Sequence, residues 1–253
     1  AYGQPTALRR RQSERAAPPL GELVEALCKK VSGLKRLRLS SLEPGDLNDD
    51  LLRVLASHEQ VVPHFHLPLQ TGSDAILRRM NRQYTRDAFL DMLDRVERAF
   101  DRPALTTDII VGFPGEDDRE FQRTLEVVDR ARFIHIHAFP YSPRPGTAAA
   151  RWTDRFIHGP VVNDRIEELN RRSLAHSLAF RSQFMGDPVN VIAESSRPGQ
   201  VGDLRQGRCE RYFMVWFEAP LVRPGDCVRV RIEQVTPTRT VGKLLPADQE
   251  VPA

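Results

Sequence analysis

Cysteine is scarce in this sequence of 253 residues. There are three, Cys28, Cys209 and Cys227, and they are far apart along the chain. An odd number of thiols with no CxxC spacing argues against a disulfide framework, and against a zinc or iron–sulfur site built from neighbouring cysteines. We therefore expect each of the three to be a small, buried apolar side chain.

Metal-ligating residues are also missing around the histidines. His64 and His66 form one i, i+2 pair, and His135 and His137 form another, so each pair faces one side of a strand. No carboxylates or thiols complete either pair. We therefore predict core or supporting histidines and no metal ligands.

Long apolar runs and a strong net charge are absent as well. No stretch reaches eighteen apolar residues, which argues against a transmembrane helix, and residues 1–19 lack the apolar core of a signal peptide. We expect residues 1–19 to be disordered and the protein to be cytoplasmic. The formal net charge of +3 neither requires nor opposes a nucleic-acid partner. The basic residues are mostly arginine, which suits phosphate contacts or reflects a GC-rich genome.

What the sequence does contain is an alternation of strand-like and helix-like segments. Its apolar periodicity predicts helices over 20–30, 51–57, 75–80, 86–100 and 117–130, and strands over 37–41, 64–69, 105–111 and 133–139. Repeated strand–helix units with short loops predict an α/β fold with a parallel sheet. Four units are too few to close an eight-stranded barrel, so we expect residues 20–154 to form a partial, curved β/α barrel.

The pattern changes after residue 154. Helical spacing predicts a connecting helix over residues 155–184. Short strands, predicted over 188–193, 211–217 and 227–235 with a last strand running into VGKL, then indicate a small all-β barrel over 185–246. Residues 247–253 form a tail.

Three predicted strands end in turns that suit a ligand. Gln70-Thr71-Gly72-Ser73 follows the strand 64–69, and Ser73 or Asp74 can cap the next helix. Gly112–Glu116 follows the second strand, and Phe139-Pro140-Tyr141 ends the third. Proteins of the α/β class place ligands at such strand ends. The alternative for any one of them is an ordinary connection between a strand and a helix.

Four sequence motifs, HLPLQTGSD, MNRQYTR, DIIVGFPGE and FPYSPRPGT, follow one another in this order. Together they resemble the radical S-adenosylmethionine (radical SAM) methylthiotransferases, over about residues 20–244. The resemblance implies a partial radical SAM β/α barrel and a pocket for S-adenosylmethionine. Its candidate contacts are Gln70, Gly72, Ser73, Arg82, Asp108, Gly112, Phe113, Pro114, Gly115, Phe139 and Tyr141.

Several of these candidates have simpler alternatives. Arg82 suits a carboxylate or is a solvated surface arginine. Phe139 and Tyr141 pack on an adenine or close the core. Glu116, next to the candidates, contacts the ligand or belongs to the first turn of the following helix.

The sequence departs from this family in one respect. The family holds a [4Fe–4S] cluster with a CxxxCxxC loop and a second cluster in an N-terminal domain, and neither is present here. The resemblance therefore implies [4Fe–4S] clusters in the intact enzyme that this chain does not ligate, and we assign no catalytic residue. We expect a fragment or a truncated product that cannot reduce S-adenosylmethionine.

The C-terminal segment resembles the TRAM domain, a small RNA-binding barrel, which implies tRNA as the partner. Aromatic residues near its basic residues suit RNA that is held by charge and by base stacking. The alternative is that the basic residues form a solvated face and the aromatic residues are buried in the core beneath it. The candidate RNA contacts are Arg144, Arg197, Arg205, Arg208, Arg239 and Lys243.

The segment Ser40-Ser41-Leu42-Glu43-Pro44 resembles the branch of the family that acts on threonylcarbamoyladenosine beside the anticodon of tRNA. We therefore predict methylthiolation of that nucleoside as the reaction of the intact enzyme. The alternatives are methylthiolation of isopentenyladenosine in tRNA or of a ribosomal protein, and a cluster-free tRNA-binding protein. No oligomeric state follows from the sequence.

Overall fold

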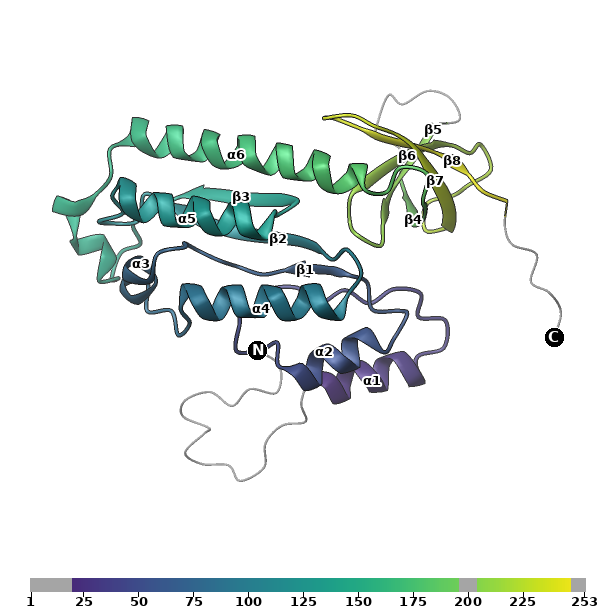
Figure 1. Ribbon diagram of the computed structural model, residues 1–253, viewed down its shortest axis with the longest axis horizontal. Coiled ribbons are helices and arrows are strands. Elements are labelled where there is room, and N and C mark those ends of the chain that lie inside the picture. The colour runs from purple at the N-terminus through teal and green to yellow at the C-terminus, as the bar shows by residue number, and fades with distance from the viewer. Residues whose placement is uncertain (1–19, 196–203, 247–253) are drawn as a thin grey trace.

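The computed structural model describes residues 20–195 and 204–246. It has an α/β part and a small all-β part, joined by one long helix (Figure 1). The N-terminal segment 1–19, the tail 247–253 and the candidate Arg197 lie outside the described residues.

A three-stranded parallel sheet forms the centre of the first part. Its strands β1 (His64–His66), β2 (Ala104–Val111) and β3 (His135–Pro140) lie in the order β1-β2-β3. The register pairs Phe65 with Leu105 and Asp108 with His137. The sequence therefore predicted β2 and β3 well, whereas β1 is shorter than the expected strand 64–69.

The strand predicted over residues 37–41 is wrong as a continuous strand. This segment makes two isolated parallel bridges, from Leu37 to Val61 and from Ser40 to His66. It lies at the edge of the sheet, and Ser41 has a left-handed backbone with a φ of 61°. An alternating pattern reports which side chains are buried, but continuous pairing also needs an extended backbone beside its neighbour.

The helices of this part are α1 (Leu20–Lys30), α2 (Asp49–Ala56), α3 (Asp74–Arg79), α4 (Arg86–Ala99) and α5 (Asp118–Ala131). Helix α2 packs against α4, and α1 packs against α2. Asn48, Ser73, Thr85 and Asp117 cap α2, α3, α4 and α5, and each side chain accepts a hydrogen bond from a backbone N–H of the first turn. Figure 1 shows α4 and α5 lying along the strands. The core between them contains Phe65, Phe89, Ile109 and Phe133.

The connecting helix α6 (Gly159–Ser182) begins later than predicted. Two short 3₁₀ turns, Ala149–Arg151 and Thr153–Arg155, precede it. Pro160 then lies in the first turn of α6, where a missing N–H costs nothing. The described part of the chain contains no helix that is both long and apolar enough to cross a membrane.

The second part is a closed barrel. Its strands are β4 (Pro188–Glu194), β5 (Leu204–Cys209), β6 (Met214–Glu218), β7 (Cys227–Val235) and β8 (Thr240–Leu244), in the order β4-β5-β6-β8-β7. The sequence missed β5, because its arginines and glycine hide the alternation. Gly207 is nevertheless needed there, since a Cβ would lie 2.1 Å from the Ile192 carbonyl oxygen of β4. β6 begins after Tyr212, whose φ of 69° belongs to a turn.

The two parts are packed against each other at the amino ends of the sheet strands. Ala104, the first residue of β2, belongs to the same buried cluster as Phe184 and Phe213. Arg36 donates hydrogen bonds to the carbonyl oxygens of Arg208 (3.0 Å) and Asn190 (2.9 Å). These contacts join the barrel to the sheet at this end of the strands.

The three cysteines are not equally buried. Cys209 is buried in β5, as predicted, and Cys28 is partly buried in α1. The prediction is wrong for Cys227, which is exposed at the start of β7. This residue follows the turn that opens the strand, and the buried side chains of β7 begin only at Val230.

Candidate functional site

The face of the sheet opposite α4 and α5 is polar. Every second residue of a strand points to this side, and those positions carry His64 and His66 in β1, Asp108 in β2, and His135 and His137 in β3. His66 is within hydrogen-bonding distance of Thr106 Oγ1 (3.1 Å) and of Asp108 Oδ2 (3.2 Å). The polar residues border two cavities, and Asp108 and Phe139 line both.

The first cavity lies at the carboxyl ends of the strands and has a volume of about 820 Å³. We call it the strand-end cavity. Six of the eleven candidate cofactor residues line it, and Arg144 lines it as well. Those six are Gln70, Arg82, Asp108, Phe113, Phe139 and Tyr141. Several aromatic side chains with a few polar groups are typical of a small-molecule pocket.

Gln70 and Asn81 both have a left-handed backbone in this cavity, and Gln70 is the buried one of the two. The φ of Gln70 is 62°, a left-handed value that is uncommon for a residue other than glycine. Its N–H donates to the Asp108 carbonyl oxygen (2.8 Å), and its carbonyl accepts from Ile110 N–H (2.9 Å). These bonds hold the strained residue at the end of β2, and strained residues of this kind concentrate at ligand sites.

Arg82 is already engaged by a carboxylate of the chain. Its Nη1 donates to Glu43 Oε1 at 2.8 Å, and both side chains are partly exposed. Glu43 belongs to the segment SSLEP, so this pair connects that segment to the strand-end cavity.

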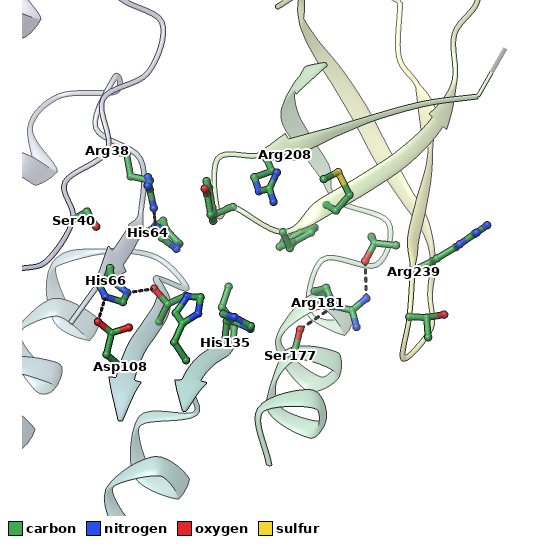
Figure 2. Close-up of a pocket in the computed structure, with 18 of the residues that line it drawn as sticks. Arg38, Ser40, His64, His66, Asp108, His135, Ser177, Arg181, Arg208 and Arg239 are labelled. Carbon is green, nitrogen blue, oxygen red and sulfur yellow. Dashed lines mark hydrogen bonds and ion pairs between the residues drawn. The ribbon is translucent and has the colours of Figure 1, made fainter. Parts of the chain in front are cut away.

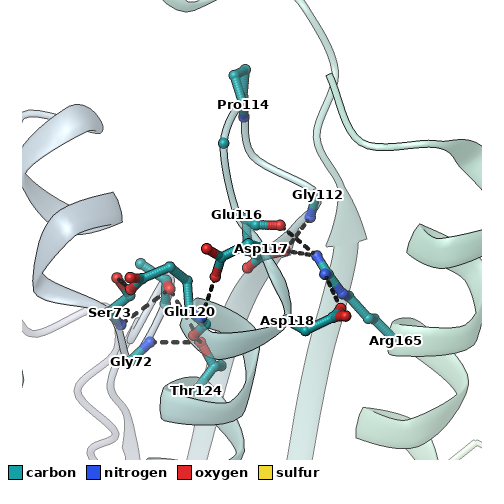
Figure 3. A network of polar contacts seen from close by, with 12 residues as sticks. Gly72, Ser73, Gly112, Pro114, Glu116, Asp117, Asp118, Glu120, Thr124 and Arg165 are labelled. Carbon is teal, nitrogen blue, oxygen red and sulfur yellow. Dashed lines mark hydrogen bonds and ion pairs between the residues drawn. The ribbon is translucent and has the colours of Figure 1, made fainter. Parts of the chain in front are cut away.

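The other five candidate cofactor residues do not line the cavity. Figure 3 shows Gly72, Ser73, Gly112 and Pro114 in and around the polar network beside it. The fifth, Gly115, accepts a hydrogen bond from Arg79 (3.1 Å). Gly72 N–H donates to Thr124 Oγ1 (2.9 Å), and Ser73 Oγ donates to the Glu120 carboxylate. These bonds hold the Gln70–Ser73 loop against α5.

A buried ion pair completes this network. Arg165 of α6 donates to Glu116 Oε2 (3.0 Å), to the Glu116 carbonyl oxygen (2.8 Å) and to Asp118 Oδ1 (2.8 Å). Glu116 is fully buried, and its Oε2 also accepts from Gly112 N–H (2.7 Å). Burial raises the pKa of Glu116, although Gly112 and Arg165 oppose this shift. Glu116 therefore anchors the Gly112–Gly115 loop from inside the protein.

Sequence reasoning missed Arg165 as a functional residue. Nothing in the local pattern of α6 distinguishes it from the other arginines of that helix. The sequence feature that could have indicated this ion pair was Glu116, an acidic residue directly after a glycine-containing turn.

The second cavity lies between the sheet and the barrel and has a volume of about 750 Å³. We call it the interdomain cavity. Figure 2 shows Arg38, Arg181, Arg208 and Arg239 around it, together with histidines of the sheet. Arg38 comes from the edge of the sheet, Arg181 from α6, and Arg208 and Arg239 from the barrel.

The candidate RNA contacts are dispersed over the structure. Arg208, paired with Glu194 (2.7 Å), and Arg239 line the interdomain cavity, whereas Arg144 lines the strand-end cavity. Arg205 donates to the carbonyl oxygens of Val222 and Pro220. Lys243 is exposed on β8. The structure thus brings two of the candidates together.

The four histidines lie on the polar face of the sheet. Among residues 20–195 and 204–246, no group of three or more histidine, cysteine or acidic side chains is placed to hold a metal ion. His64 is buried, with its Nδ1 3.4 Å from Arg38 Nη1. Because arginine can only donate, Nδ1 is the acceptor, and the proton of the neutral ring is on Nε2.

His64 is expected to make the fold sensitive to acid. Burial, assisted by the charge of Arg38, lowers the pKa of His64 to about 3. The unfolded chain binds a proton near pH 6.5 and the folded chain does not, so stability falls as the pH decreases from 6.5 towards 3, by up to about 4 kcal/mol. Urea unfolding at several pH values checks this.

In this experiment the His64→Gln variant should lose less stability than the wild type over that pH range. His158→Gln, at an exposed histidine, is the control and should keep the wild-type dependence. Equal pH dependence in the wild type and His64→Gln would contradict the prediction.

Comparison with known proteins places this geometry in a family. Residues 2–128, half of the chain, match the model of the radical SAM superfamily. The fold is similar to that of coproporphyrinogen III oxidase from Escherichia coli, a radical SAM enzyme, with a TM-score of 0.50 and 15% identity, covering 85% of this chain and 50% of that one.

Two curated relatives share more sequence. The tRNA-2-methylthio-N(6)-dimethylallyladenosine synthase 1 of Mycobacterium marinum is 40% identical over 216 residues, which is 83% of this chain and 41% of the relative. The tRNA-2-methylthio-N(6)-dimethylallyladenosine synthase of Paracoccus denitrificans is 37% identical over 224 residues, which is 88% of this chain and 49% of the relative. The chain thus spans less than half the length of these relatives.

Proposed function

The chain belongs to the radical SAM superfamily, and from this premise we propose that it is part of a tRNA methylthiotransferase that modifies N6-dimethylallyladenosine. The observation that carries the proposal is the 37–40% identity over more than four fifths of the chain to relatives named for that product. The radical SAM fold of the first part supports it.

The choice of nucleoside differs from the prediction made from the segment SSLEP. The names of the relatives favour dimethylallyladenosine, which is the isopentenyladenosine alternative, over threonylcarbamoyladenosine. The contacts of the segment agree with a role in turning the chain: Glu43 pairs with Arg82, and its N–H donates to Asp46 Oδ2 (3.0 Å). These contacts within the chain account for Glu43 without a bound nucleoside.

The strand-end cavity fits the adenosyl part of S-adenosylmethionine. Phe113, Phe139 and Tyr141 offer aromatic surface for an adenine, while Gln70 and Asp108 offer hydrogen-bonding groups for ribose hydroxyls. When bound, S-adenosylmethionine supplies the methyl group and the radical of the family's reaction. The residues of this chain bind and orient it.

A [4Fe–4S] cluster does not fit the described residues. Cys28 lies in α1, and Cys209 and Cys227 lie in separate strands of the barrel, with no cluster of ligands around them in residues 20–195 and 204–246. No step of the reaction is assigned to these cysteines.

The cofactor assignment predicts a binding defect. Gln70→Ala should bind S-adenosylhomocysteine about tenfold more weakly than the wild type, because one buried hydrogen-bonding group is lost. Equilibrium dialysis with labelled S-adenosylhomocysteine measures this. Gln83→Ala, at an exposed glutamine outside the cavity, is the control. Equal affinity of wild type and Gln70→Ala would show that the Gln70 side chain does not contact the ligand.

The barrel of β4–β8 is proposed to be a TRAM-like tRNA-binding domain. Its position after α6 and its basic residues support this role. The reaction itself is tested by deleting the coding sequence in its host and measuring the nucleosides of total tRNA by mass spectrometry.

Three outcomes of the deletion experiment are distinct. Loss of the methylthio derivative of dimethylallyladenosine supports the proposal. Loss of the methylthio derivative of threonylcarbamoyladenosine instead would show that the chain belongs to the branch predicted from the segment SSLEP. If neither derivative changes while the purified chain binds tRNA, the cluster-free tRNA-binding alternative replaces the proposal.

A further inference from the structure

The interdomain cavity carries an excess of positive charge. Four arginines line it, and Asp108 is the one carboxylate among its described lining residues. Arg208 is paired with Glu194, but Arg38, Arg181 and Arg239 have no carboxylate partner in the part of the chain that the structure describes. Three uncompensated guanidinium groups around one cavity favour an anion.

Arg181 is the most informative of the three because it is buried, with 7% of its surface exposed. Its donors reach neutral acceptors: Thr240 Oγ1 (2.9 Å), the Pro237 carbonyl oxygen (3.2 Å) and Ser177 Oγ (3.3 Å). Figure 2 shows Arg181 and Ser177 at the wall of the cavity. A buried charge without a counter-charge is costly, and an anion in the cavity would compensate it.

A second buried donor lines the same cavity. His64 is 1% exposed, and its Nε2 has no hydrogen-bond partner among the described residues. Since Nδ1 accepts from Arg38, Nε2 carries the proton and is an N–H donor. Buried donors are nearly always satisfied, so this one also indicates a missing acceptor.

Aromatic rings accompany the arginines. The Arg38 guanidinium lies 4.3 Å from the ring centre of Tyr212, and that of Arg239 lies 5.2 Å from the ring centre of Trp216. Tyr212 is 41% exposed, and its backbone has a left-handed φ of 69°. Arginines that bind phosphate, next to accessible aromatic rings that stack on bases, are the combination that binds single-stranded nucleic acid.

We propose that the interdomain cavity binds a phosphodiester of single-stranded RNA, with Arg38, Arg181 and Arg239 around the phosphate and Tyr212 and Trp216 beside an unpaired base. This site rests on the proposed function in taking tRNA as the ligand. It adds Arg38 and Arg181 to the candidate RNA contacts and differs from the outer face of the barrel, where Lys243 lies. Ser40 and Ser41 of the segment SSLEP also line it.

Anisotropy of a labelled anticodon stem-loop RNA, titrated with the whole chain at several salt concentrations, tests the site. Arg38→Gln and Arg239→Gln should each weaken binding about tenfold and reduce the salt slope by about one. Arg231→Gln removes the same charge from an exposed position on β7, paired in register with Lys243, and should change the affinity by less than about twofold. Arg181→Gln is left out of the main comparison because Arg181 also supports the fold.

The possible failures are separate from one another. If Arg231→Gln weakens binding more than Arg38→Gln and Arg239→Gln, the outer face of the barrel is the RNA surface and our site is wrong. If inorganic phosphate at micromolar concentration displaces the RNA, the cavity is a small-anion site and the RNA proposal is wrong.

The proposed function fails differently. The two variants could weaken RNA binding as expected while the deletion strain keeps its methylthiolated nucleosides. This result would support the RNA site in the cavity and contradict the methylthiotransferase proposal. If the deletion removes the methylthiolated nucleoside but both variants bind RNA like the wild type, the methylthiotransferase proposal is supported and the RNA site in the cavity is contradicted.

Discussion

Replacing Arg165 with methionine should lower the free energy of unfolding by about 3–5 kcal/mol. The substitution leaves Glu116 fully buried and ionisable, with Gly112 N–H as its remaining hydrogen-bond donor. It also removes the two bonds from α6 to the Glu116 carbonyl oxygen and to Asp118. Urea unfolding followed by circular dichroism measures the change.

Two further variants give this experiment its controls. Arg171→Met removes an exposed arginine of the same helix that pairs with Glu168, and should cost less than about 1 kcal/mol. Glu116→Gln keeps an acceptor for Gly112 N–H and should cost less than Arg165→Met. A loss below about 1 kcal/mol for Arg165→Met would show that the buried pair does not hold the loop.

The pH dependence of the same variants reports on Glu116. Because burial raises its pKa above the ordinary value of 4.5, the folded chain binds this proton more tightly than the unfolded chain does. The contribution of Glu116 to the free energy of unfolding is therefore most favourable below pH 4.5, and it is lost as the pH rises through the raised pKa. The Glu116→Gln variant should lack this loss.

Replacing Gly72 with alanine is the second change with a large expected effect. An added Cβ would lie 2.5 Å from the Arg123 carbonyl oxygen and 2.7 Å from Thr124 Cα, both backbone atoms of α5. The loop or the helix must move, and the bond from Gly72 N–H to Thr124 Oγ1 is lost or lengthened. We expect a destabilisation of about 2–3 kcal/mol.

Gly45→Ala is the matched control for Gly72→Ala. Gly45 also lies in a loop, but a Cβ there would have no atom within 4 Å, and its backbone is not left-handed. Its melting temperature should stay within about 2 °C of that of the wild type. If Gly72→Ala unfolds at the same temperature as Gly45→Ala, the close approach of the loop to α5 is not required.

Much of the local structure could be predicted from the sequence. Helix α1 begins and ends at the predicted residues, and Ser73, one of the two predicted candidates, caps α3. Strands β2, β3 and β7 lie where apolar or alternating residues predicted them. Periodicity and capping depend on neighbours within a few residues, so the order of residues alone determined these features.

The membership of the chain in its family was also visible in the sequence, through the four motifs. The same motifs did not separate the residues that line the strand-end cavity from those that hold its loops. Gln70 and Gly72 are two positions apart, yet Gln70 lines the cavity and Gly72 packs on α5.

The remaining features required the tertiary structure. Arg165 approaches Glu116 from a helix 49 positions away, and Arg38, Arg181 and Arg239 meet around one cavity from the sheet, α6 and the barrel. The burial of Arg181 and the exposure of Cys227 likewise depend on how the barrel closes. The order of residues determined the helices, the caps and the family, whereas packing between distant segments decided which charges are buried and which of them face a cavity.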